Sequence, residues 1–105
     1  KACGFTICEI HTGPFAEAVL EHNLVLDHPD VIRERNRVAE AVRFVQEIGL
    51  QCNAGHGLTH HNVRLIASIE GISELHIGHS IVSRAVLVGM QASVAEMKSQ
   101  IKDAT

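Results

Sequence analysis

Three histidines stand at the ends of apolar runs, and two of them directly follow a glycine. His56 lies between two glycines, His79 follows Gly78, and His11 precedes a Thr-Gly-Pro turn. Glycine lets the backbone approach a ligand closely, and an unperturbed imidazole titrates near pH ~6.5, so it exchanges protons at neutral pH. The pattern predicts acid–base chemistry at His56; the alternative is a histidine that only closes a loop.

Short apolar strands and amphipathic helices alternate along the chain. We expect strands at residues 5–11, 50–54 and 74–78, and helices at residues 14–22, 29–47, 59–69, 81–88 and 90–102. This alternation predicts an α/β fold with a parallel sheet covered by helices. The carboxyl ends of parallel strands lie at one edge of the sheet, so His11, His56 and His79 should gather there.

Periodicity predicts which side chains each element buries. The apolar faces of the helices at 29–47 and 90–102 comprise Val31, Val38, Val42 and Val45, and Met90, Val94, Met97 and Ile101. Glu9 and His11 share one face of the first strand, as a buried pair or as groups facing a ligand. His60 and His61 should face solvent.

Two expected helix starts point at the same edge of the sheet. Thr59 and Ser80 are suitable N-cap residues, and free N–H groups at helix starts bind phosphate. In (βα)8 barrels the loops after the last two strands, with a short extra helix, commonly form a phosphate site. We therefore expect Gly57, Gly78 and His79 to bind small phosphorylated substrates or inorganic phosphate.

Composition argues against several classes of partner. The formal net charge is −3 and only three residues are aromatic, so neither a phosphate-backbone footprint nor a base-stacking platform for nucleic acid is expected. No apolar run approaches the roughly 20 residues that span a bilayer. We expect a soluble protein without a membrane partner.

Cysteine, histidine and lysine placement narrows the chemistry further. The cysteines are Cys3, Cys8 and Cys52, an odd number without metal-ligand spacing, which predicts buried free thiols in a reducing compartment such as the cytoplasm. A metal site made by His56, His60 and His61 would lack an acidic ligand, so we assign no metal and no cofactor. The lysines are Lys1, Lys98 and Lys102; none lies in an expected strand, which argues against a Schiff-base aldolase.

Three stretches together form a specific pattern. They are CEIHTG at residues 8–13, GLQCNAGHGLTHHNV at residues 49–63 and ELHIGHSIVSRAV at residues 74–86. They closely resemble the C-terminal part of the pyridoxine 5′-phosphate synthase family. The resemblance implies that residues 1–105 are a C-terminal segment of one TIM-barrel domain, with strands six to eight of a (βα)8 barrel and the first five strands outside this chain.

The resemblance also implies an activity. The family condenses 1-deoxy-D-xylulose 5-phosphate with 3-amino-2-oxopropyl phosphate to form pyridoxine 5′-phosphate in vitamin B6 biosynthesis, and phosphate and water leave. It implies a transferase-type cytoplasmic enzyme that forms a large homo-oligomer.

By motif, His56 matches the family's proton donor, Gly57 a substrate-binding backbone position, and Gly78 with His79 the phosphate-binding turn. The possible pocket-lining residues at the end of strand six are Glu9, His11 and Thr12. His76 stands where relatives are expected to have asparagine, and residues 14–30 diverge from the family.

The family's other acid–base residues lie outside these 105 residues. We therefore predict that the chain alone is inactive. Three parallel strands also leave two unpaired sheet edges. The alternative is a non-catalytic half-barrel that binds phosphate or associates with itself.

Overall fold

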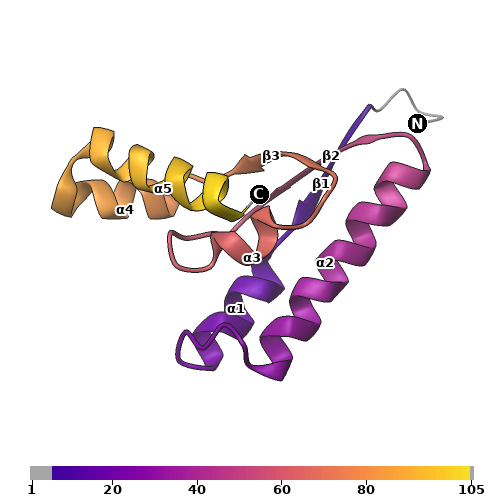
Figure 1. Ribbon diagram of the computed structural model, residues 1–105, viewed down its shortest axis with the longest axis horizontal. Coiled ribbons are helices and arrows are strands. Elements are labelled where there is room, and N and C mark those ends of the chain that lie inside the picture. The colour runs from indigo at the N-terminus through magenta and orange to yellow at the C-terminus, as the bar shows by residue number, and fades with distance from the viewer. Residues whose placement is uncertain (1–5, 105) are drawn as a thin grey trace.

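The computed structural model describes residues 6–104 of the chain (Figure 1). The elements in order are β1 (Ile7–His11), α1 (Gly13–Glu21), α2 (Pro29–Glu47), β2 (Gln51–Gly55), α3 (Val63–Ala67), β3 (Ile72–His76), α4 (His79–Val88) and α5 (Met90–Ala104). Strands alternate with helices as the sequence predicts. The α/β class is therefore confirmed.

The strands form one parallel sheet in the order β1-β2-β3. Cys8 of β1 pairs with Cys52 of β2, and Ala54 of β2 pairs with Leu75 of β3. Because all three strands run the same way, their carboxyl ends lie at a single edge. This edge holds the loops that follow His11, Gly55 and His76.

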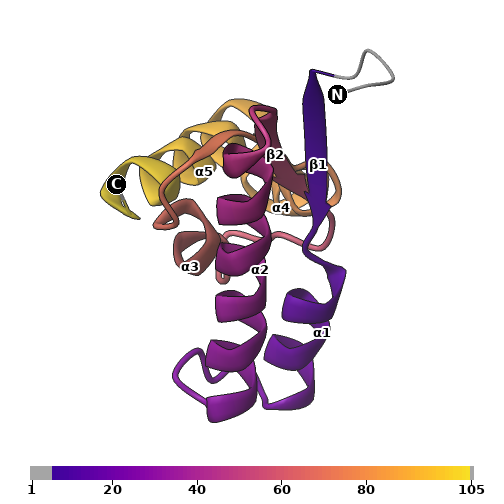
Figure 2. The ribbon, with the colours of Figure 1, turned by 90° about the vertical axis from the view of Figure 1, so that its right-hand side faces the viewer.

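One face of the sheet is covered by helices and the other is not. α2 runs alongside β1 and β2 (Figure 2), and it buries Val31, Val38, Val42 and Val45, as predicted. The covered face of the sheet includes Cys52 and Ala54, at 1% and 0% exposure. On β1, Ile7, Glu9 and His11 instead form an exposed face, so Glu9 and His11 are not a buried pair.

The two cysteines in the described residues are free thiols. Burial, and secondarily the neighbouring Cys8, raises the pKa of the Cys52 thiol, which favours the unreactive protonated form. The prediction of free thiols holds for both, although Cys8 is only half-buried. Cys3 lies outside the described residues, as does Phe5, the predicted first residue of the first strand.

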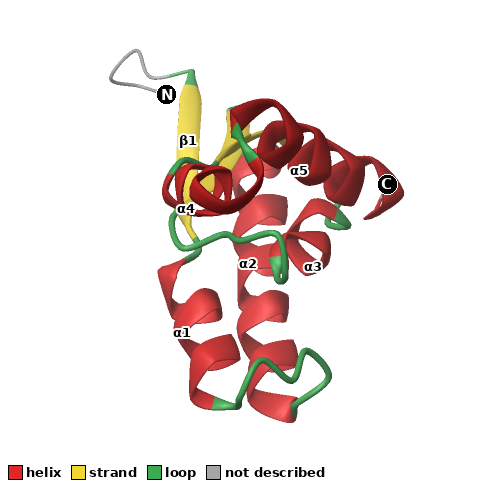
Figure 3. Ribbon diagram, turned by 90° about the vertical axis from the view of Figure 1, so that its left-hand side faces the viewer, coloured by secondary structure: helices red, strands yellow, loops and turns green. Residues whose placement is uncertain are grey.

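α4 and α5 form a hairpin that projects from the sheet (Figures 1 and 3). α5 packs against α4 and α3, Ser93 Oγ donates to the carbonyl of Ile81 at 2.6 Å, and Arg84 makes two hydrogen bonds with Glu96 at 3.0 and 3.2 Å. None of the ten described residues of α4 is buried. Much of its apolar surface is therefore open.

Several element bounds differ from prediction. β3 begins and ends two residues earlier than expected, and α4 begins at His79 rather than Ile81. Gly78, not Ser80, is the N-cap of α4. The last helix buries Met97, but Met90 is 52% exposed, because it begins α5 beside the exposed hairpin turn.

No helix within residues 6–104 is long and apolar enough to cross a membrane.

Candidate phosphate-binding and acid–base site

A cavity of about 920 Å³ opens at the carboxyl edge of the sheet. Its lining includes five predicted site residues: His11, His56, Gly57, Gly78 and His79. They follow three different strands and are brought together by the parallel topology. The cavity also includes His76, Asn62 and Ser80. The predicted gathering of three histidines at one edge is confirmed.

His56 has an unusual backbone. Its φ is 90° and that of Gly57 is 75°, both in the left-handed region that side chains other than glycine rarely adopt. Such a conformation costs on the order of 1–3 kcal/mol and is commonly found at functional sites. The ring of His56 stacks on His11 with centroids 4.3 Å apart. The exposed imidazole is thus fixed at the mouth of the cavity.

Thr12 anchors the turn at Gly55 and His56 through hydrogen bonds. Its side-chain oxygen lies 2.8 Å from the carbonyl of Gly55 and 2.6 Å from that of His56, and its hydroxyl donates to one of them at a time. Its backbone N–H also donates to Gly55 at 2.8 Å. Thr12 is fully buried and does not line the cavity. The expectation of a pocket-facing Thr12 is therefore wrong, because its hydroxyl is used to position His56.

Gly57 is required by close packing as well as by its φ. A Cβ built there would lie 2.6 Å from the Cβ of Ala16, closer than real contacts allow. Gly78 differs, because a Cβ there meets nothing within 4 Å among the described atoms. Gly57 is thus fixed by structure, whereas Gly78 leaves open space beside the start of α4.

Glu9 lies on the open face of the sheet and outside the described lining of the cavity. Its Oε1 is 3.4 Å from His76 Nδ1, and both side chains are about half exposed. The other ring nitrogen of His76, Nε2, is 3.5 Å from Asn53 Nδ2. His76, singled out in the sequence only as a departure from the family, therefore joins the open face to the cavity.

The turn before α3 already uses its own N–H groups. Asn62 Oδ1 accepts from the N–H of Thr59 at 2.8 Å, and Thr59 Oγ1 accepts from those of His61 and Asn62 at 3.2 and 3.1 Å. The expectation of a helix from residue 59 that offers free donors is therefore wrong. At the start of α4, by contrast, no described side chain caps the helix, so its first N–H groups are open to an anion.

His60 is half-buried, which corrects the expectation that it faces solvent. Its Nε2–H donates to the carbonyl of Ser93 at 3.0 Å, so in the neutral ring Nδ1 accepts from the Ser80 hydroxyl at 3.1 Å. His60 thereby connects α5 to the start of α4. No local pattern indicates this contact, because Ser93 lies 33 residues away.

His61 is exposed, as predicted, and its Nε2–H donates to the carbonyl of Leu24 at 2.8 Å. His56, His60 and His61 thus point to three different partners. They are not among the described groups that converge closely enough for a metal ion. The alternative of a metal site at these three residues is not supported.

Comparison with known proteins identifies the family of this chain. A family model described as "Pyridoxal phosphate biosynthesis protein PdxJ" matches residues 1–103. The chain belongs to the PdxJ family. The expected family is confirmed.

Curated members of the PdxJ family match almost the whole chain. Proteins named pyridoxine 5′-phosphate synthase from Dechloromonas aromatica and Azoarcus sp. are 44% and 45% identical over 101 residues, or 96% of this chain. That from Coxiella burnetii is 47% identical over 104 residues, or 99% of the chain. The chain spans about 40% of the length of these relatives.

Proposed function

We propose that this chain is the C-terminal part of a pyridoxine 5′-phosphate synthase, with β1, β2 and β3 as strands six to eight of a (βα)8 barrel. The enzyme would condense 1-deoxy-D-xylulose 5-phosphate with 3-amino-2-oxopropyl phosphate in vitamin B6 biosynthesis, as a cytoplasmic homo-oligomer. The single observation that carries the proposal is His56, held at a positive φ over the cavity in a chain 44–47% identical to enzymes of that name.

The open face of the sheet supports the barrel. Glu9, Asn53 and Glu74 lie side by side in register across the three strands, on the face that helices do not cover. In a closed barrel this face would point inward. The polar interior would be continuous with the cavity at the carboxyl edge, where (βα)8 enzymes place their active sites.

The residues of the cavity suit the two demands of the reaction. Loss of water requires a proton for the departing oxygen, and the exposed imidazole of His56 is placed to donate it. The phosphate groups require N–H donors, which Gly57 and the start of α4 at Gly78 and His79 offer. His11 supports the ring of His56 by stacking, and Thr12 positions its backbone.

The test is His56→Asn in an enzyme with the complete barrel. Asparagine tolerates a positive φ, so the fold should persist while turnover falls about 10²–10⁴-fold, the usual contribution of a general acid. Phosphate binding should be retained. His61→Asn is the matched control, since His61 is exposed and does not line the described cavity, and its turnover should be unchanged. Normal turnover by His56→Asn would end the catalytic assignment.

A half-barrel that binds phosphate or associates with itself is the second candidate. The exposed apolar side chains of α4 favour it, with Val86 at 82% and Leu87 at 78% exposure. Phosphate titration followed by NMR, with size-exclusion chromatography, separates the two. Shifts at Gly57, Gly78 and His79 in a 105-residue protein that self-associates would favour it, whereas ring-closing turnover by this chain alone would contradict our prediction of inactivity.

A further inference from the structure

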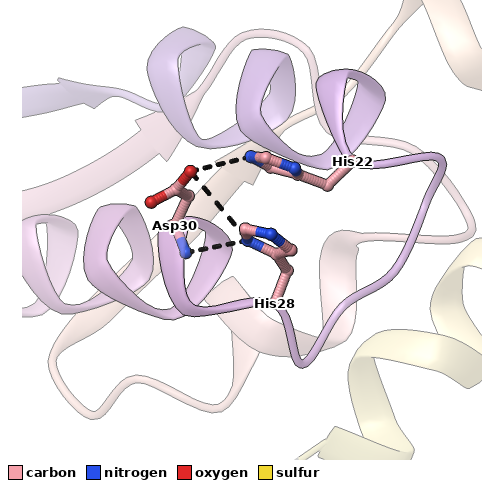
Figure 4. Close-up of side chains that lie close together, drawn as sticks. All are labelled: His22, His28 and Asp30. Carbon is pink, nitrogen blue, oxygen red and sulfur yellow. Dashed lines mark hydrogen bonds and ion pairs between the residues drawn. The ribbon is translucent and has the colours of Figure 1, made fainter.

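A second group of ionisable side chains converges at the junction of α1 and α2, outside the lining of the cavity. His22 is the C-cap of α1, His28 is the N-cap of α2, and Asp30 lies in the first turn of α2. One ligand atom from each lies within 4.8 Å of the other two. Figure 4 shows both imidazoles turning a nitrogen toward the carboxylate of Asp30.

The two rings lie face to face. They stack with centroids 3.5 Å apart and planes 11° from parallel. His22 Nε2 lies 2.8 Å from Asp30 Oδ2, and His28 Nδ1 lies 4.0 Å from the same oxygen. His28 Nδ1 also accepts the backbone N–H of Asp30 at 3.1 Å, so this nitrogen is unprotonated, and an ion that displaces the cap bond can use its lone pair.

Arg33 orients the carboxylate without occupying the shared oxygen. Its Nη2 binds Oδ1 of Asp30 at 2.5 Å, which leaves Oδ2 directed at the imidazoles. The guanidinium charge beside Oδ1 favours the ionised carboxylate, which is the form that binds a metal ion.

We propose that His22 Nε2, His28 Nδ1 and Asp30 Oδ2 bind a divalent transition-metal ion of the zinc class, with solvent at the remaining position. Two imidazoles and one carboxylate suit zinc, whereas magnesium and calcium prefer oxygen ligands. The three side chains are 26%, 35% and 38% exposed, so an ion can reach them from solvent. Nothing in the family motifs involves these residues.

Metal binding requires a local rearrangement of these side chains, because at least one of the stacked rings must turn before both can direct a nitrogen at the same ion. In a tetrahedral site with bonds of about 2.0–2.1 Å, ligand atoms lie roughly 3.3 Å apart. His22 Nε2 and Asp30 Oδ2 would separate slightly from 2.8 Å, and His28 Nδ1 would approach that oxygen from 4.0 Å. The ion replaces the cap bond from Asp30 and the His22 hydrogen bond. Nε2 of His22 gives up its proton on binding, and the neutral ring then carries its proton on Nδ1. Binding would then join the end of α1 to the start of α2.

The test is a titration of untagged, metal-free purified protein with zinc chloride, followed by calorimetry and by NMR of the histidine rings. We expect one ion per chain, with ring shifts confined to His22 and His28. His22→Gln, His28→Gln and Asp30→Asn should each weaken the Kd by more than about 10-fold, since even partners that only orient a ligand contribute about 10–100-fold. Absence of binding at submillimolar zinc would overturn the proposal.

His76→Gln is the matched control, because His76 also lies between two carboxylates, at 3.4 Å from Glu9 and 3.7 Å from Glu74. It should leave zinc binding unchanged. A loss of affinity in this variant, or ring shifts at His76 instead of His22 and His28, would place the ion elsewhere and refute the site. Circular dichroism without zinc checks that each variant folds; if one does not, the ring shifts of the unaltered protein decide.

Discussion

Two stacked pairs of histidines within residues 6–104 have different surroundings. His11 and His56 stack 4.3 Å apart at the mouth of the cavity, whereas His22 and His28 stack 3.5 Å apart beside the carboxylate of Asp30. The first pair lines the cavity, and His11 Nδ1 accepts the N–H of Gly13 at the start of α1 at 3.3 Å. The second lies next to an anionic oxygen. The same ring therefore suits proton transfer in one place and cation binding in the other.

The two pairs also differ in backbone conformation. His56 is held at φ 90° by its neighbours, while His22 and His28 cap helix ends at negative φ. A strained backbone persists only where the surrounding structure fixes it. The cavity pair is thus positioned by the fold, and the other pair by its local hydrogen bonds.

The largest effect should be that each histidine pair loses its own function when one of its members is replaced, while the other pair keeps its function. In an enzyme with a complete barrel, His56→Asn should lower turnover about 10²–10⁴-fold and leave zinc affinity unchanged. His22→Gln should do the reverse, because His22 has no part in the proposed proton transfer and does not line the described cavity. Steady-state kinetics and zinc titration on both variants measure this. Parallel losses in one variant would break the distinction.

Gly57→Ala should destabilise the protein by about 1–3 kcal/mol, because its Cβ would clash with Ala16 and alanine disfavours a positive φ. Gly78→Ala should change stability by less than about 1 kcal/mol, since nothing described lies within 4 Å of its Cβ. Urea unfolding of both variants tests the difference. Equal destabilisation would mean that Gly78 is also constrained by packing.

His56→Gly should relieve strain that His22→Gly cannot. Glycine at φ 90° removes on the order of 1–3 kcal/mol of strain, offset by about 0.5–1 kcal/mol of additional backbone entropy lost on folding. We expect unchanged or higher stability for His56→Gly and lower stability for His22→Gly, measured by thermal unfolding. A clear loss of stability at position 56 would show that the imidazole contributes more packing than its exposure suggests.

The smallest effect should be on the stability of the folded protein at acid pH. The pKa of Asp30 is lowered on folding, so Asp30 stabilises the folded state above its unfolded pKa of about 3.9, and this stabilisation is lost as the pH falls through the folded value. His22, His28 and Arg33 face this carboxylate. Asp30→Asn should flatten the decline of melting temperature below about pH 4, whereas His56→Asn should leave it unchanged.

Sequence reasoning predicted the features that depend on local periodicity and strand order. The valine face of α2 and the meeting of His11, His56 and His79 at one edge need only helical spacing and a parallel sheet. The family motifs then indicated Gly57 and Gly78. These features depend on residues close in sequence or on a topology that the alternation of elements already implies.

The features that sequence reasoning missed depend on contacts between distant side chains. Thr12 supports His56 across 44 residues, and His60 contacts Ser93 across 33. The convergence of His22 with Asp30 requires the chain to reverse between α1 and α2, through Asn23 and Leu24 at positive φ. Asparagine commonly adopts a positive φ but leucine rarely does, so the sequence carries only a partial signal for that turn.

The exposed hairpin of α4 and α5 has a consequence for ligand affinity. With none of its described residues buried, α4 should open locally far more often than β2, and its amides should exchange hydrogen fastest among the helices. A phosphate held at its start would bind only the closed form and so slow that exchange. Part of the binding free energy would then be used to order the helix. The measured affinity would therefore depend on the stability of the α4–α5 hairpin as well as on the contacts between phosphate and protein.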